Sequence, residues 1–383
     1  MTNERSIGVV FAPDSFKGSL TSVQVARALA TGWARGRPGD RISLAPLADG
    51  GEGTLVAIEA AGGWEWREAD VADPLGRPVR ARWLRSTDGG RAFVEMAEAS
   101  GLSRVAPIER DAMRASTYGT GQLILDALEA GVRHVVLGIG GSATSDGGLG
   151  LIAALGGLPS PDMPDPTVIP DGVDLGGLDP RLAEVDMRIA CDVTNPLLGE
   201  RGAAATYGPQ KGASPGQVEV LDQRLQRWAD VLEAAGGRSV RDTPGAGAAG
   251  GLGFGLLAIG SRFRSLELVA GVELVMDETD LDGKLRAAAV VVTGEGRIDA
   301  QTAFGKTALG VARRARAAGF ACIAVGGGVE PEGIVALAAE GVLVVPVAEV
   351  PQSVEAAMAA GMPPLERCGE RLARLVSLGG SIA

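Results

Sequence analysis

Five short segments of this 383-residue sequence place a carboxylate, usually with glycine and a hydroxyl, directly after an apolar run. Backbone N–H groups of such loops hold phosphate oxygens, and carboxylates hold Mg²⁺ directly or through water. A single loop of this kind is also typical of a turn or a helix cap, where Asp, Gly, Ser and Thr are common. Their repetition favours a site for phosphate and a hard divalent ion, and the segments span residues 13–18, 49–54, 141–148, 192–196 and 294–299.

Lysine is rare in this chain, because 32 of the 36 basic residues are arginine. Lys17, Lys211 and Lys306 lie in glycine-rich loops beside carboxylates or hydroxyls, whereas Lys284 is expected to be an ordinary surface residue. A compact ammonium differs from a planar guanidinium in reach and geometry, and it is a common phosphate ligand. Asn195 is one of two asparagines, and its amide could orient an oxygen ligand without adding charge. We therefore predict that these rare types are present because substitutes would fail.

The apolar runs before these loops alternate with helical patterns, which is typical of parallel βαβ units. In open sheets of this kind, ligands bind beyond the carboxyl ends of the strands, so the loops are expected to converge there. Residues 63–96 differ, since their turn signals predict antiparallel hairpins, and strand signals recur around 266–276. The last hundred residues return to βαβ, so one economical arrangement pairs residues 1–80 with 280–383 and inserts residues 81–279 between them.

Composition excludes several classes of function. The formal net charge is −11 and there is no basic run, which argues against nucleic acid and anionic membranes as partners. The three cysteines match no metal-binding spacing. His134 is the single histidine, so mechanisms that need a histidine base are poorly supported. The N-terminus has no signal-peptide shape and no apolar run approaches the ~18 residues of a spanning helix, so we expect a cytoplasmic protein.

Two nucleotide-binding motifs are matched only in part. GAGAAG at residues 245–250 fits the dinucleotide pattern, but no clear strand precedes it. AQTAFGKT at residues 300–307 resembles a P-loop, but Ala300 stands where glycine is required. The two motifs therefore predict neither a dinucleotide-binding site nor a P-loop, although Lys306 could still contact phosphate in another geometry.

Taken together, the motifs resemble those of the type I glycerate kinases. The matching segments follow the family order over nearly the whole chain, and they include APDSFKGSLTS, PLADGGEGT, FVEMAEASGL, GIGGSATSDGGLG, ACDVTNPLLGERGAAATYGPQKGA and VVTGEGRIDAQTAFGKTALGVA. The resemblance implies two α/β domains: a parallel-sheet, Rossmann/flavodoxin-like domain interrupted by an inserted α/β domain with a mixed sheet, with the active site in the cleft between them. The sequence departs from the family at Ala308, in a short loop at 158–171 and at 324–329.

The implied reaction is the ATP-dependent, Mg²⁺-assisted phosphorylation of D-glycerate, favouring 2-phosphoglycerate over 3-phosphoglycerate. Asp192 is the hypothesised general base, with Asn195, Lys17 and Lys211 as further catalytic residues. Two alternatives stay open: a kinase for another small hydroxy acid, and a non-catalytic binding protein on the same scaffold. The oligomeric state, monomer or homodimer, also stays open. The expected substrate-binding residues are Asp14, Ser15, Asp49, Gly50, Gly51 and Glu52; the nucleotide-binding residues are Gly140, Gly141, Ser142, Thr144, Gly294 and Lys306; the metal ligands are Asp192, Glu295 and Asp299.

Overall fold

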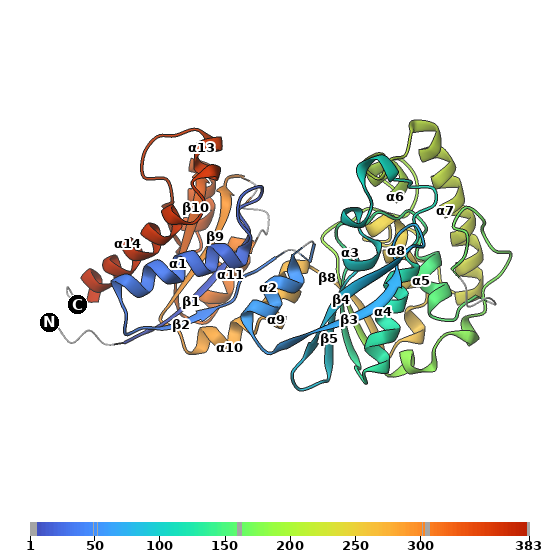
Figure 1. Cartoon of the computed structure of the whole chain (residues 1–383), viewed down its shortest axis with the longest axis horizontal. Helices are drawn as coiled ribbons and strands as arrows, with labels where there is room; N and C mark the ends of the chain where they lie inside the picture. Colours follow the sequence, from blue (N-terminus) through green and yellow to red (C-terminus); the bar gives the residue numbers. More distant parts are fainter. Residues whose placement is uncertain are drawn as a thin grey trace. The chain divides into compact units, whose positions relative to one another are not determined.

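The computed structural model of the chain describes residues 6–48, 50–51, 53–158, 163–300, 302 and 307–380. The chain forms two compact units (Figure 1). The first comprises Met1–Asp49, Val56–Gly62 and Val272–Ala383, and the second comprises Gly50–Leu55 and Gly63–Gly271. Residues 50–55 and 63–80, which were expected in the first domain, belong to the second unit, and residues 272–279, expected in the inserted domain, belong to the first.

Within the described residues, the first unit holds a five-stranded sheet of order β11-β10-β9-β1-β2, in which each neighbouring pair is parallel. The register aligns Pro13 of β1 with Gly294 of β9, and Glu295 with Gly326 of β10. The residues that follow β1 therefore lie beside the end of β9. The strands are β1 (Gly8–Pro13), β2 (Arg41–Leu44), β9 (Val290–Ile298), β10 (Ala321–Val329) and β11 (Leu343–Pro346).

The helices of the first unit pack against this sheet and against each other. Helix α1 begins after Thr21, whose capping box with Gln24 satisfies two backbone donors. Helices α1 and α14 approach closely, because a Cβ added to Gly32 would lie 1.7 Å from the carbonyl oxygen of Glu366. The helices are α1 (Ser22–Gly36), α10 (Leu281–Arg286), α11 (Thr307–Ala317), α12 (Pro331–Ala338), α13 (Val354–Ala359) and α14 (Pro363–Gly380), together with most of α2 (Thr54–Ala61) and α9 (Gly271–Glu278). Thr54 and Leu55 of α2 and Gly271 of α9 belong to the second unit.

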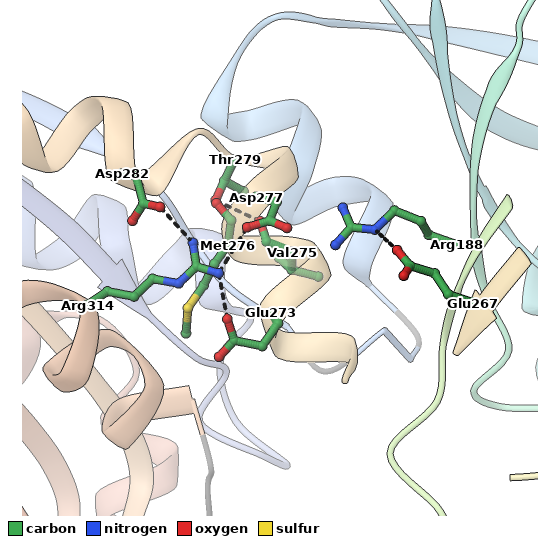
Figure 2. A network of polar contacts seen from close by, with 9 residues as sticks. All are labelled: Arg188, Glu267, Glu273, Val275, Met276, Asp277, Thr279, Asp282 and Arg314. Carbon is green, nitrogen blue, oxygen red and sulfur yellow. Dashed lines mark hydrogen bonds and ion pairs between the residues drawn. The ribbon is translucent and has the colours of Figure 1, made fainter. Parts of the chain in front are cut away.

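Two basic residues join helices of this unit. Figure 2 shows Arg314 of α11 paired with Glu273 and Asp277 of α9, at 2.5 and 2.9 Å, and with Asp282 of α10 at 3.2 Å. Lys284 of α10 donates to the carbonyl oxygens of Thr279, at 2.6 Å, and of Ala61, at 3.0 Å. The prediction that Lys284 is an ordinary surface residue is therefore wrong: its ammonium binds carbonyls at two helix ends, and burial lowers its pKa.

The second unit is built on a mixed sheet, with six strands in its described part and the order β3-β4-β5-β6-β7-β8. The predicted hairpins are present, since β3–β4 and β4–β5 pair antiparallel, while β5 to β8 are parallel. On the last two strands, Arg188 pairs with Glu267 at 3.1 Å (Figure 2). The strands are β3 (Trp64–Ala72), β4 (Pro78–Ser86), β5 (Arg91–Glu95), β6 (His134–Gly138), β7 (Asp186–Ala190) and β8 (Ser265–Val269).

The parallel strands of this sheet end together, because Glu95, Gly138, Ala190 and Val269 are aligned in register. The strand expected around 266–276 ends at Val269, and helix α9 begins at Gly271, where buried residues recur at helical spacing. The helices of this unit are α3 (Ala97–Ser100), α4 (Tyr118–Glu129), α5 (Leu149–Ala154), α6 (Ala203–Tyr207), α7 (Pro215–Gly236) and α8 (Ala248–Ala258).

One parallel and one mixed sheet confirm the predicted α/β class with a parallel-sheet domain interrupted by a mixed-sheet domain. No helix in the described ranges combines the length and the apolar character needed to cross a membrane.

Candidate active site

In the first unit, the loop after β1 is held against the end of β9. The backbone N–H of Asp14 donates to the carbonyl of Gly294 at 2.8 Å. The Asp14 carboxylate accepts from the Ser15 N–H at 2.6 Å and from the Thr307 hydroxyl, at the start of α11, at 2.7 Å. The structure therefore brings together Asp14, Ser15 and Gly294, as expected of neighbouring strand ends.

The next residues along both strands also meet. A Cβ added to Gly296 would lie 3.1 Å from the Cα of Phe16 and 3.4 Å from the backbone nitrogen of Lys17, so the two loops are in contact. The side chain of Lys17 is exposed at this edge. Glu295 is 8% exposed and accepts a hydrogen bond of 2.7 Å from Thr302.

The predicted metal ligands are divided between the units. Asp299 lies near Glu295, because the Thr302 hydroxyl that donates to Glu295 also accepts from the Asp299 N–H at 3.1 Å. Asp192 belongs to the second unit. Among the residues described, no three His, Cys, Asp or Glu side chains group so as to hold a metal ion. Mg²⁺ usually keeps several waters and takes only one or two protein carboxylates, so the Glu295–Asp299 loop fits its chemistry.

In the second unit, Gly50 and Gly51 lie on the ends of the parallel strands. A Cβ on Gly50 would be 2.7 Å from the Cβ of Ala190, and a Cβ on Gly140 would be 2.7 Å from the Cα of Gly51. Gly50 also has φ of +83°, which side chains rarely adopt. Glycine is therefore required at position 50 and at position 140, and the loop of Gly50 and Gly51 is in contact with Gly140.

Glu95 holds this loop in place, although it is absent from the residues predicted from the sequence. The residue ends β5, is 4% exposed, and accepts a 2.7 Å hydrogen bond from the N–H of Leu55 in the first turn of α2. A carboxylate at a helix N-terminus is favourably placed. The available signal was its position at the end of an apolar run, but no glycine-rich loop follows it.

The loop after β6 is anchored by Asp146. This buried carboxylate accepts four hydrogen bonds of 2.8 to 3.1 Å, from the N–H and hydroxyl of Thr117 and from the N–H groups of Gly148 and Gly150. Burial raises its pKa, against the opposing effect of these donors. Of the predicted phosphate-binding residues on this loop, Gly141 has φ of +72°, and Ser142 and Thr144 are buried.

Asp192 follows β7 as predicted and is exposed. Its carboxylate accepts a 2.8 Å hydrogen bond from the N–H of Gly271, the first residue of α9. Gly271 in turn lies beside Gly50, since a Cβ on Gly50 would be 3.5 Å from the Gly271 Cα. The proposed base thus lies at the same edge of the sheet as Gly50, Gly51 and Gly140.

Asn195 and Lys211 make contacts within the protein. The Asn195 amide donates to the carbonyl of Arg201 at 2.8 Å and accepts from the hydroxyl of Tyr207 at 2.8 Å. Lys211 is 1% exposed, and its Nζ lies 2.5 Å from the carbonyl oxygen of Thr144. Burial lowers the pKa of Lys211 to about 7, against the attraction of Asp146. The remaining predicted site residues Asp49, Glu52 and Lys306 lie outside the described residues.

Polar, glycine-rich loops at the carboxyl ends of parallel strands define an α/β protein of the type that binds small ligands at those ends. The match to known proteins is more specific. A family model described as "Glycerate kinase family" matches residues 9–377. The chain belongs to the glycerate kinase family, and it is a kinase.

Individual relatives agree over most of their length. Glycerate kinase of Halalkalibacterium halodurans is 46% identical over 326 residues, which cover 83% of this chain and 85% of that protein. Glycerate 2-kinase of Escherichia coli K12 is 44% identical over 315 residues, covering 80% and 82% of the two chains. A crystal structure of a protein assigned as glycerate kinase 2 from Salmonella typhimurium LT2 has a TM-score of 0.84 at 38% identity, and the match covers 98% of this chain and 100% of that one.

Proposed function

We propose that this protein transfers the γ-phosphoryl group of ATP to D-glycerate, with Mg²⁺, to give 2-phosphoglycerate rather than 3-phosphoglycerate. The observation that carries the proposal is the family match over residues 9–377. The name glycerate 2-kinase of the Escherichia coli relative, at 44% identity, supports the 2-position. A cytoplasmic role in glyoxylate or sugar-acid catabolism is part of the same proposal.

Asp192 is the proposed general base. Phosphoryl transfer depends mainly on positioning and charge neutralisation, and a base that accepts the proton of the attacking hydroxyl completes it. The Asp192 carboxylate is exposed, so a substrate hydroxyl can reach it, and its hydrogen bond from Gly271 fixes its direction. Gly50, Gly51 and Gly140, which lie at the same edge of the sheet, contribute backbone without side chains there.

The loops of the first unit carry the proposed nucleotide functions. Glu295 and Asp299 would hold Mg²⁺, which supplies charge neutralisation at the phosphates when bound. Lys17, an exposed residue of the loop after β1, would bind phosphate oxygens as a point charge. Asp14 is held by Ser15 and Thr307, and this places the backbone of the Lys17 loop against Gly296.

The test is a coupled assay for ADP release with D-glycerate, followed by NMR of the product. We expect ADP only when the hydroxy acid is present, and phosphorus coupled to the proton on C2. Turnover with tartronate or erythronate but not with D-glycerate would replace the substrate. No ADP with any of these acids would leave only a binding function and refute the proposal.

A further inference from the structure

A closed ring of contacts joins three segments of the second unit around Lys211. The Nζ of Lys211 lies 2.5 Å from the carbonyl oxygen of Thr144 and 6.0 Å from the ring centroid of Tyr207. The Tyr207 hydroxyl donates to Asn195 Oδ1 at 2.8 Å, and the Asn195 carbonyl accepts from the Gly247 N–H at 2.9 Å. The Thr144 hydroxyl, 3.4 Å from the carbonyl oxygen of Ala249, closes the ring. We call these six residues the Lys211 ring.

Two of the three segments that meet here carry predicted site residues, and the third packs against one of them. Thr144 ends the predicted phosphate loop after β6, and Asn195 lies three residues beyond Asp192, after β7. The third segment, at the start of α8, has left-handed backbone at Ala249, with φ of 54°, and at Gly250. A Cβ on Gly250 would lie 1.9 Å from the Thr144 carbonyl oxygen, so this segment and the β6 loop fit each other only with glycine.

Burying the Lys211 ammonium is unfavourable unless the surrounding protein supplies hydrogen bonds and charge to it. Taking an ammonium out of water costs several kcal/mol, and the cost is offset only by hydrogen bonds and nearby charge. Here the Thr144 carbonyl, the face of Tyr207 and the carboxylate of Asp146 supply them. Lys211 is 1% exposed, so its ammonium is enclosed by protein, whereas Lys17 is an exposed residue.

We propose that Lys211, Tyr207 and Asn195 are positioning residues, which lock the loop after β6 to the segment after β7 and thereby keep Asp192 in its reactive orientation. On this view Lys211 acts through the Thr144 carbonyl, and its ammonium does not bind the transferred phosphoryl group. The inference rests on the proposed function for its kinetic consequence, but the ring itself is a property of the folded chain.

The first test compares two neutral replacements of Lys211. Lys211→Met keeps the length and removes the donor, whereas Lys211→Gln keeps an N–H donor for the Thr144 carbonyl. We expect kcat to fall about 10- to 100-fold in Lys211→Met, the scale of a misplaced reacting group, and to recover at least in part in Lys211→Gln. KM for D-glycerate should stay within about twofold, whereas KM for ATP should change in step with kcat and recover with it in Lys211→Gln, because the loop after β6 carries the predicted nucleotide-binding residues. Equal losses in both variants, with a raised KM for ATP, would assign Lys211 to the phosphate and overturn the proposal.

The second test removes one hydroxyl. Tyr207→Phe deletes the hydrogen bond to Asn195 and keeps the aromatic side chain beside Lys211. We expect kcat to fall about 2- to 10-fold, the scale of one lost hydrogen bond. Tyr118→Phe, at the only other tyrosine of the chain, is the matched control and should leave kcat unchanged. Full activity in a folded Tyr207→Phe variant would contradict the ring.

A readout that needs no activity separates this inference from the proposed function. In hydrogen–deuterium exchange, Lys211→Met and Tyr207→Phe should both increase exchange in peptides covering residues 140–150 and 192–213, while peptides of β3 and β4 are unchanged. Faster exchange without glycerate kinase activity in the wild type would refute the function and keep the ring. Unchanged exchange in both peptides would refute the ring, whatever the substrate.

Discussion

Lys211 should make the stability of the second unit depend on pH between 7 and 9. Its pKa is about 7 in the folded protein because of burial, against an ordinary value of 10.5 in the unfolded chain. Over this range the unfolded state therefore binds more protons than the folded state, so the free energy of unfolding rises with pH. Below pH 7 both states carry the proton and the slope disappears.

The size of the effect follows from these two pKa values. Once the folded group is neutral, each pH unit contributes about 1.4 kcal/mol, and at pH 7 the group is half protonated. The free energy of unfolding should accordingly rise by about 2 kcal/mol from pH 7 to pH 9 through this residue alone. Lys211→Met removes the titrating group, so the wild type should gain this amount relative to the variant.

The measurement is urea unfolding of both proteins at pH 7, 8 and 9, followed by tryptophan fluorescence. Four of the five tryptophans, Trp64, Trp66, Trp83 and Trp228, lie in the second unit, so the signal reports mainly on it. Cysteine pKa values raised by burial give the opposite slope above pH 9 in both proteins, and they cancel in the difference. Parallel stability curves for the wild type and Lys211→Met would refute the reasoning that the buried ammonium titrates in this range.

Substitutions at three positions test the site. Asp192→Asn keeps the acceptor for the Gly271 N–H, so the fold should persist while kcat falls about 10²- to 10⁴-fold in the coupled assay, the scale of losing a general base. Lys17→Arg keeps the charge but changes its shape, and kcat should fall about 10-fold; wild-type activity would remove the basis of the argument from rare lysines. Glu95→Ala leaves the buried N–H of Leu55 without this acceptor, so it should lower the free energy of unfolding in urea by about 1–3 kcal/mol and raise KM for D-glycerate. Glu95→Gln restores an acceptor and should restore both the stability and KM.

The strand-end loops could be predicted because their signal is local. Glycine and aspartate after an apolar run mark the place where a parallel strand ends, and the register then brings Asp14 beside Gly294. Glu95 could not be found in this way, because its importance depends on the N–H of Leu55, forty residues away, and no turn residues mark it. The strand expected at 266–276 failed for a related reason: Leu266, Leu268, Val272 and Leu274 alternate as in a strand, but the helix begins at Gly271.

The rarity of lysine and asparagine can have more than one physical cause. A composition that replaces lysine by arginine spares the positions where a guanidinium does not fit, and a buried ammonium at a carbonyl oxygen is such a position as much as a phosphate contact is. The ammonium groups of Lys284 and Lys211 both bind backbone carbonyl oxygens: Lys284 those at two helix ends, and Lys211 that of Thr144. Rarity alone therefore does not say whether a lysine stabilises the fold or binds a ligand; burial and the carbonyl contacts assign Lys211 and Lys284 to the first role, and the proposed phosphate contact of the exposed residue Lys17 stays a prediction.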